Sequence, residues 1–366
     1  MWKVRRLVNA LVPQSQRHRR ETIEQVQHRL RERPSLEDVL HGFRLILGRE
    51  PENEQIIDAH MNIPTVSELR RTLLVSSEFQ GKYKMMRPET HDHPGLSIER
   101  EAVVFIHMPK TGGTTLRALL AGQFPADRVC PVQEDKLHLL SVAELGQYDF
   151  FAGHFDRSSI CFIPRKEIKT VVLFREPRAR LISYYRFLRA HPNRDEFAND
   201  LCIRLAHELT AEEFFEYPPM RRIFLVDNHY LIALGASLSW YERKLGLPLS
   251  KEEISRALEE AKRLIRTTTA IGVTERFDQS VELICKALHL GKPPSIAPLH
   301  VTSNFVELDA RFRRVEPVTM TPRLASALDE LTVYDNELYR FATQEFERQC
   351  AELGVFNYPM GLSEKT

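Results

Sequence analysis

Cysteine is scarce in this sequence, and its five copies are scattered. Cys130, Cys161, Cys202, Cys285 and Cys350 include no Cys-x-x-Cys pair. An odd, dispersed set is typical of reduced thiols rather than of a disulfide framework or a zinc site. We therefore expect a cytoplasmic protein without a cysteine-ligated zinc site.

Long apolar runs are also missing. No stretch approaches the roughly 20 apolar residues that a membrane-spanning helix needs, and the N-terminus lacks the apolar core and the cleavage site of a convincing signal peptide. Residues 1–12 mix apolar with basic side chains, and this segment could rest weakly on the anionic inner surface of a membrane. Because Pro13 ends it early, a docked terminal helix is the favoured interpretation.

A strong excess of one charge is the third missing feature. The chain carries 51 basic and 50 acidic residues, so no global positive field predicts a nucleic-acid partner. Its hydrophobic content of 43% is that of a globular protein, and 366 residues leave room for one large domain and a small one.

Composition and periodicity divide the chain into five segments. They are a helical, basic N-terminal segment (1–34), a small helical module (35–85), a linker (86–100), a large α/β domain (101–354) and a C-terminal tail (355–366). The linker contains two prolines and a glycine without any apolar period. The module begins with Ser35 and Asp38 spaced as a capping box, and an apolar stripe at helical spacing follows.

Two phrases of this module, LILGREPENEQI and ELRRTLLVSSEF, resemble a small helical module of bacterial proteins, the DUF4214 type, which often stands beside glycan-handling domains. The match covers about residues 36–84. It implies no catalysis and indicates an interaction or spacer role.

The large domain is organised around the stretch VVFIHMPKTGGTTL, residues 103–116. Its apolar start predicts a buried parallel strand, and the glycine pair lets the backbone come close to a ligand. Thr114 or Thr115 is expected to cap the helix that follows. Backbone N–H groups at the helix N-terminus, the helix dipole and Lys110 together predict a phosphate site.

A second motif is VVLFREPRARLIS, in which Arg175 ends a predicted strand and Ser183 lies on the helix begun by Pro177. In a parallel sheet, Arg175 then lies at the carboxyl edge, where ligands bind. A guanidinium and a hydroxyl that converge there can hold a phosphate. The alternative is an Arg–Glu surface pair with an unrelated helix serine.

Further strands are expected at 148–154, 168–174 and 270–274, and they alternate with helical patterns. Such alternation predicts an α/β fold with a P-loop-like, doubly wound parallel sheet and helices on both faces, preceded by a small all-α domain.

The order Pro-Lys-Thr-Gly-Gly-Thr resembles the 5′-phosphosulfate loop of sulfotransferases that use 3′-phosphoadenosine-5′-phosphosulfate (PAPS). The Arg–Ser pair, eight residues apart, resembles their 3′-phosphate motif. The phrases RLISYYRFLR, AGHFDRSSI, LVDNHYLIALGA, AIGVTERFDQSVELI and YDNELYRFA bring the resemblance closer to the carbohydrate sulfotransferases, in particular the heparan-sulfate 2-O-sulfotransferase-like branch and its bacterial relatives. The resemblance covers about residues 101–350.

This resemblance implies sulfuryl transfer from PAPS, without a metal, to a hydroxyl of a glycan or glycolipid. Lys110 would stabilise the leaving phosphate, and His154 would accept the proton of the acceptor hydroxyl. The residues implied to bind the cofactor are Lys110, Thr111, Gly112, Gly113, Thr114, Thr115, Arg175 and Ser183. Where that branch often has His-Gly-His, this chain has Ala152-Gly153-His154, so His107 or a nearby carboxylate stays open as the base.

Two other functions compete with this one. The fold could bind a nucleotide or a glycan without catalysis, as the missing histidine and the added helical module would allow. A P-loop kinase would need a Walker A loop and a magnesium ligand, whereas Lys110 precedes the glycine pair here. Arg276 could reach the nucleotide or form an ion pair with Glu275 or Asp278.

Overall fold

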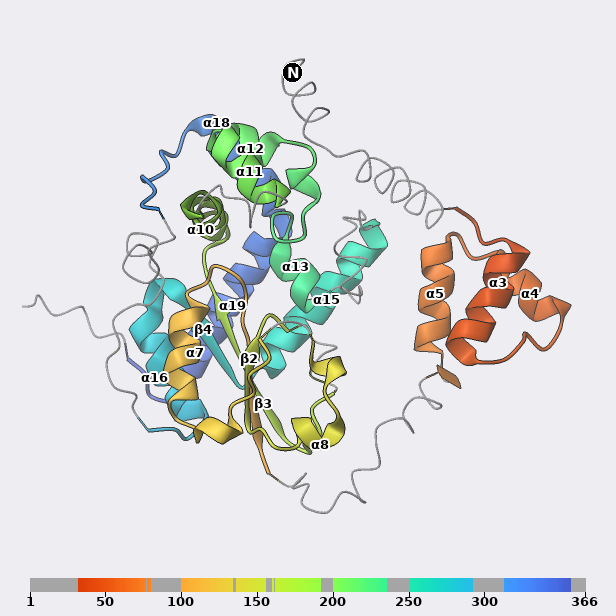
Figure 1. The fold of residues 1–366 in the computed structure, drawn as a ribbon, viewed down its shortest axis with the longest axis horizontal. Coiled ribbons are helices and arrows are strands. Elements are labelled where there is room, and N and C mark those ends of the chain that lie inside the picture. Colours follow the sequence, from red (N-terminus) through yellow and green to blue (C-terminus); the bar gives the residue numbers. More distant parts are fainter. Residues whose placement is uncertain are drawn as a thin grey trace, which may run out of the picture. The chain divides into compact units, whose positions relative to one another are not determined.

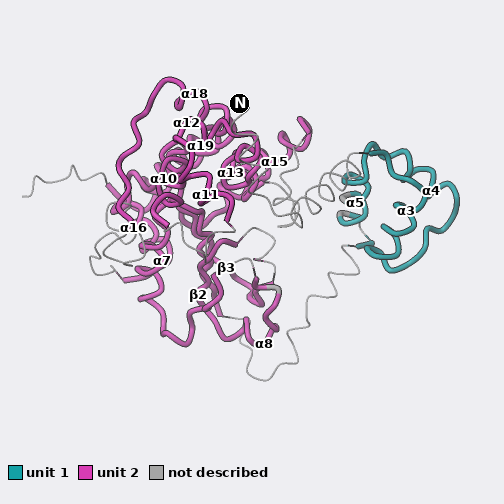
Figure 2. Tube along the Cα trace, turned by 45° about the horizontal axis from the view of Figure 1, so that its top comes forward, with its two compact units in different colours: residues 1–92 teal, residues 93–366 magenta. Residues whose placement is uncertain are grey.

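The computed structural model describes residues 32–76, 78–79, 100–133, 136–155, 160, 162–191, 200–235, 250–291 and 313–356. The chain forms two compact units, residues 1–92 and 93–366 (Figure 2). The division between them falls inside the segment predicted as a linker. The predicted N-terminal segment up to residue 31, and the tail from residue 357, lie outside the described residues.

The smaller unit is a cluster of short helices. They are α3 (Leu36–Gly42), the π-helical turn η1 (Phe43–Leu47), α4 (Glu54–Met61) and α5 (Val66–Val75). The Ser35 hydroxyl accepts from the N–H of Asp38, whose carboxylate accepts from the N–H of Ser35, so the predicted capping box forms. Gly48 ends η1 in the left-handed conformation (φ 66°). The core of this unit consists of Val39, Phe43, Leu47, Leu69 and Leu73.

The larger unit is built on a sheet of four parallel strands in the order β2-β1-β3-β4. The strands are β1 (Ala102–Ile106), β2 (Phe150–Gly153), β3 (Ile168–Phe174) and β4 (Ala270–Val273). Every residue of β1, β2 and β4 is buried. A parallel sheet covered on both faces requires such continuous apolar strands, and this explains why they read as apolar runs in the sequence.

Two helices cover one face of this sheet (Figure 1). They are α7 (Gly113–Ala121) and α16 (Phe277–Ala287), and they pack against strand side chains such as Phe105 and Leu173. Because neighbouring residues of a strand point to opposite faces, Val104 and Phe174 belong to the other side.

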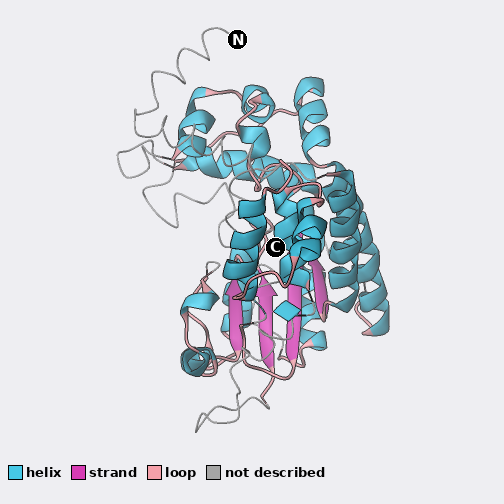
Figure 3. Ribbon diagram, turned by 90° about the vertical axis from the view of Figure 1, so that its right-hand side faces the viewer, coloured by secondary structure: helices cyan, strands magenta, loops and turns pink. Residues whose placement is uncertain are grey.

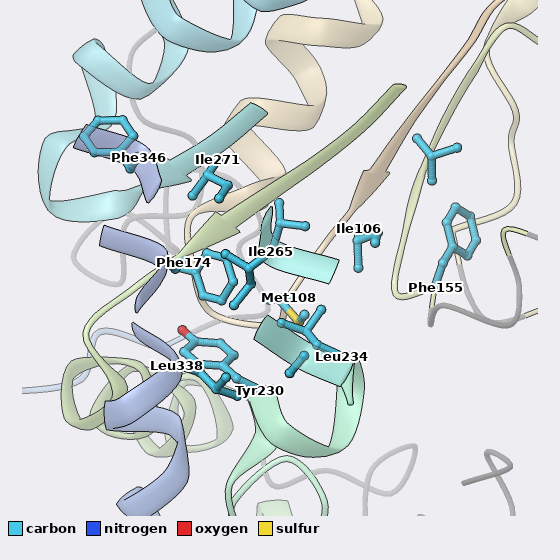
Figure 4. Packing of buried hydrophobic residues seen from close by; sticks show 14 of the residues in the cluster. Ile106, Met108, Phe155, Phe174, Tyr230, Leu234, Ile265, Ile271, Leu338 and Phe346 are labelled. Carbon is cyan, nitrogen blue, oxygen red and sulfur yellow. The ribbon is translucent and has the colours of Figure 1, made fainter. Parts of the chain in front are cut away.

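Three helices cover that opposite face, and Figure 3 shows the strands side by side with helices packed around them. They are α13 (His229–Leu234), α15 (Lys251–Thr267) and α19 (Val333–Glu352). Figure 4 shows Tyr230, Leu234, Ile265 and Leu338 of these helices packed with Phe174. Helices on both faces of a parallel sheet confirm the predicted α/β fold.

A further group of helices lies beyond the sheet and has a core of its own. It comprises α10 (Pro177–Ala190), α11 (Leu201–Glu208), α12 (Ala211–Glu216) and α18 (Pro322–Leu331), and its buried side chains include Phe214 and Leu328. The remaining short elements are α8 (Val142–Leu145), η3 (Ala126–Arg128), η4 (Leu137–Leu139), η5 (Met220–Arg222) and η6 (Thr274–Arg276). Within the described ranges, no helix combines the length and apolar character needed to cross a bilayer.

Candidate functional site

Each strand of the sheet is followed directly by a residue of the candidate site. His107 follows β1, His154 follows β2, Arg175 follows β3 and Thr274 follows β4. Since the strands are parallel, these residues meet at one edge of the sheet, where open α/β sheets bind their ligands. The fold therefore brings together motifs that lie far apart in the sequence.

Helix α7, which follows the loop after β1, begins earlier than the sequence suggests. Gly112 (φ 82°) and Lys110 (φ 70°) both lie in the left-handed region. The prediction that Thr114 or Thr115 caps the helix is wrong, because Gly112 is the N-cap and Gly113 is already helical. Glycine suits this position because a positive φ costs it nothing. No side chain caps this helix, and the Gly112 carbonyl oxygen accepts from the N–H of Thr115 over 3.2 Å.

Hydrogen bonds from neighbouring strand ends anchor this loop. The Thr274 hydroxyl lies 2.5 Å from the carbonyl oxygen of Thr111 and 2.8 Å from that of Phe174. The Arg175 guanidinium donates to the carbonyl oxygen of Lys110 over 3.1 Å. The buried Thr111 hydroxyl donates within the loop, over 2.9 Å. Sequence reasoning missed Thr274, although its position at the end of a predicted strand could have indicated it.

The anchored carbonyl groups also determine where the loop directs its N–H groups. A trans peptide places its C=O and N–H on opposite sides, and the protein has no cis peptide among its described residues. The N–H groups of Thr111 and Gly112 therefore point away from Arg175 and Thr274. Together with the N-terminus of α7, they form a donor surface of the kind that binds anions.

The residue Lys110 is half-buried as a whole, but its ammonium group is desolvated by burial and lies near a second cation. Its Nζ lies 3.8 Å from the centroid of the Phe187 ring on α10, a cation–π contact. Burial, with a smaller contribution from the Arg175 charge, lowers the pKa of Lys110 to about 7. Burial also lowers the pKa of Arg175. A bound anion would stabilise both charges.

Ser183 shares a face of α10 with Phe187. The two residues are four positions apart on one helix, so their side chains lie one above the other on the same side. Ser183 is 8% exposed, and it lies on the side of α10 that meets Lys110. The structure thus links the two predicted motifs, through the Arg175 hydrogen bond and through this helix face. Thr114 and Thr115 lie in the first turn of α7, where Thr115 is buried.

His154 is exposed and is oriented by the backbone of a second histidine. Its Nδ1 lies 2.8 Å from the carbonyl oxygen of His107. A carbonyl oxygen only accepts, so Nδ1 carries the proton and the neutral ring keeps its basic nitrogen at Nε2. This tautomer is the one that a general base would use to accept a proton through Nε2.

His107 has a different environment. Its ring lies 4.6 Å from that of His154 and 5.4 Å from that of Phe105, measured between centroids. Burial, followed by the charges of His154, Lys110 and Arg117, lowers the pKa of His107 to about 3. A histidine with so low a pKa is neutral at physiological pH and is a weak proton acceptor. The environment therefore favours His154 over His107 as a base.

Arg276 forms an ion pair with a partner that the sequence did not indicate. Its guanidinium lies 3.2 Å from the Glu347 carboxylate and stands over the Phe346 ring, whereas Glu275 and Asp278 were the expected partners. No group of three or more His, Cys, Asp or Glu side chains among the described residues is placed to hold a metal ion.

Comparison with known proteins gives general support to the sulfotransferase class, which the two motifs resemble. No family model matches the chain. Over 100 residues, the chain is 30% identical to a protein of Arabidopsis thaliana named protein-tyrosine sulfotransferase. The matched stretch is 27% of this chain and 20% of that relative, so the chain spans about a fifth of the length of the curated relative that it matches. The DUF4214-type module and the carbohydrate branch stay predictions.

The packing of His107 on the loop predicts different effects for the glycine that begins α7 and the glycine that follows its last residue. A Cβ at Gly113 would lie 2.1 Å from Cδ2 of the His107 ring, whereas one at Gly122 would meet nothing closer than 3.5 Å. Gly113→Ala should lower the free energy of unfolding by about 1–3 kcal/mol. Gly122→Ala, at an ordinary helical φ of −65°, should raise it by about 0.4–1 kcal/mol. Urea unfolding measures both, and equal effects would contradict the close packing.

The lowered pKa of Lys110 predicts that removing its charge stabilises the free protein. A buried ammonium opposes folding fully below its folded pKa of about 7, and the penalty disappears as pH rises toward the unfolded pKa of about 10.4. Lys110→Met should therefore raise the melting temperature by several degrees at pH 6–7.

That gain should shrink steadily from about pH 7 to pH 10. Lys251→Met is the matched control, because Lys251 is exposed at the start of α15. Its melting temperature should differ little from that of the wild type at any pH. A Lys110→Met protein that is less stable than the wild type at neutral pH would contradict the buried, destabilising charge.

Proposed function

We propose that this protein is a PAPS-dependent sulfotransferase that sulfates a hydroxyl of a glycan or glycolipid. The observation that carries the proposal is the 3.1 Å hydrogen bond from Arg175 to the carbonyl oxygen of Lys110. It joins the Pro-Lys-Thr-Gly-Gly-Thr loop and the Arg–Ser motif into one cationic site at the carboxyl edge of the sheet. A donor with phosphates at both its 5′ and 3′ positions matches two adjacent phosphate motifs.

Two groups of residues would hold this donor. The 5′-phosphosulfate would lie on the anchored loop and the first turn of α7, which comprise Lys110, Thr111, Gly112, Gly113, Thr114 and Thr115. The 3′-phosphate would lie on Arg175 and Ser183. Thr111 would contribute its backbone N–H, because its hydroxyl already donates within the loop. When bound, PAPS supplies the sulfuryl group and leaves as adenosine 3′,5′-bisphosphate.

Lys110 and His154 would do the chemical work. The Lys110 ammonium would neutralise charge on the departing phosphate oxygen, and such stabilisation needs no metal. Nε2 of His154 would take the proton of the acceptor hydroxyl as the hydroxyl oxygen attacks the sulfur of the sulfuryl group. The proton already fixed on Nδ1 by the His107 carbonyl keeps the ring in the tautomer that this step requires.

A second acceptor is favoured by a specific observation. The Arabidopsis relative is named for the sulfation of protein tyrosine, so a tyrosine side chain of a protein is the alternative to a sugar hydroxyl. Both acceptors require the same donor site and the same base. They differ only in the hydroxyl group, of a sugar or of a tyrosine, that approaches His154.

Transfer from radiolabelled PAPS distinguishes these functions. The protein is incubated with polysaccharides, glycolipids and a tyrosine-containing peptide, each separately, once in EDTA and once in Mg²⁺. Lys110→Ala is the inactive control. Label on polysaccharide or glycolipid is the expected result. Label on the peptide would replace the sugar acceptor with tyrosine. Tight binding of the nucleotide without any transfer would favour a non-catalytic binding protein, and a strict need for Mg²⁺ would favour a kinase.

The assignment of His154 predicts a loss of turnover without a loss of nucleotide binding. His154→Ala should reduce turnover by roughly 10²–10⁴, the usual contribution of a general base. The affinity for adenosine 3′,5′-bisphosphate should stay near that of the wild type, since His154 follows β2 and not the phosphate loop. Initial rates and calorimetric titration measure the two quantities.

His289→Asn is the control for this variant. His289 is exposed beyond the end of α16, which starts at the carboxyl edge and runs back toward the opposite edge of the sheet, and asparagine tolerates the positive φ of 55° there. This variant should keep full turnover. If His154→Ala retains more than about a tenth of wild-type turnover, another group is the base.

A further inference from the structure

Helices α13 and α19, which lie on the face of the sheet opposite α7 and α16, cap each other. The Asn228 side chain accepts from the N–H groups of Tyr334 (2.8 Å) and Asp335 (3.3 Å) in the first turn of α19. In return, the Asp335 carboxylate accepts from the N–H groups of Tyr230 (2.8 Å) and Leu231 (3.2 Å) in the first turn of α13. Each helix thus takes its cap from the other, and the two phrases LVDNHY and YDNELY form one structural device.

The carboxylate at the centre of this device is buried with a cation beside it. Asp335 and Arg180 are both fully buried, and Nη2 of Arg180 lies 3.9 Å from Oδ2 of Asp335. Burial raises the pKa of Asp335 to about 7. Nε and Nη2 of Arg180 and Oδ2 of Asp335 are buried without a hydrogen-bond partner in the described part of the chain. A buried ion pair of this kind is weak evidence for stability, so a further role is worth seeking.

Tyr230 connects the device to the candidate site. Its hydroxyl accepts from the N–H of Arg175 (3.0 Å) and donates to the carbonyl oxygen of the same residue (2.8 Å). The Tyr230 ring is fully buried and meets Phe174 edge to face, with centroids 5.2 Å apart (Figure 4). One side chain therefore satisfies both backbone groups of Arg175, just beyond the end of β3.

We propose that Tyr230 is a positioning residue whose hydroxyl, held in place by the reciprocal caps of α13 and α19, aims the Arg175 guanidinium at the 3′-phosphate of the nucleotide. This inference rests on the proposed function. Without the two hydrogen bonds, the Arg175 backbone can rotate, and its guanidinium loses the fixed direction that bidentate phosphate binding requires.

The test compares the affinities for adenosine 3′,5′-bisphosphate and for AMP, measured by calorimetry. Their ratio reports only the 3′-phosphate contact. Tyr230→Phe should lower this ratio by about 5- to 30-fold, as expected for two lost hydrogen bonds, while AMP affinity changes little. Tyr185→Phe is the matched control, because it removes another buried hydroxyl, which donates to the Leu209 carbonyl over 2.7 Å. It should leave the ratio unchanged.

A second variant covers the case in which Tyr230→Phe does not fold. Asn228→Gly removes the cap of α19, and glycine accepts the φ of 42° at this position. It should also lower the affinity ratio, but by a smaller factor than Tyr230→Phe. An unchanged ratio in the folded variants would overturn the positioning role, since a merely structural residue changes stability and not this ratio. If the wild type binds both nucleotides equally, the proposed function itself fails, and the inference fails with it.

Discussion

The phosphate-loop candidate is held by its carbonyl oxygens, and the rest of the site depends on this constraint. Arg175 and Thr274 donate to the carbonyl oxygens of Lys110 and Thr111. Each of these bonds fixes a peptide plane, and each plane then directs its N–H to the opposite side. A loop of donors is thereby produced by anchoring acceptors. The anchors directly follow β3 and β4, so the loop geometry depends on the sheet as well as on the loop sequence.

The same edge concentrates features that oppose folding. Lys110 combines a positive φ, which is uncommon for a residue with a Cβ, with a buried charge near that of Arg175. Strain and like charges of this kind persist only where the surrounding structure fixes them. A ligand that carries negative charge would relieve the repulsion between the two cations, although not the backbone strain. The electrostatic cost of bringing Lys110 and Arg175 together would therefore favour the binding of an anion.

The two histidines illustrate how one residue type takes two roles from its surroundings. His107 is enclosed by Phe105, His154 and the α7 backbone at Gly113, and its charged form is suppressed. Its carbonyl oxygen then fixes the ring of the exposed His154. In this chain, the residue that precedes Gly153 is Ala152, which is buried in β2. The neighbour of His154 therefore comes from β1, an adjacent strand, and not from its own.

The sequence by itself determined the class of fold, and it identified the two motifs that are predicted to bind phosphate. Continuous apolar runs such as Ile168–Phe174 coincide with the strand in the structure, because a strand buried on both faces tolerates few polar residues. The helix expected to begin at Pro177 is α10. Local signals failed where two solutions were equally compatible with the residues, as at the cap of α7, which Gly112 provides instead of a threonine.

Only the tertiary structure decided which distant residues support the site. Thr274 and Tyr230 lie about 160 and 55 residues from the groups that they hold, and hydrogen bonds of this kind leave no periodicity in the sequence. The same applies to the pKa of His107 and of Lys110, since burial and neighbouring charges arise only when β1, α10 and α7 meet. Patterns along the chain record which face of an element is buried, and the fold decides what that face meets.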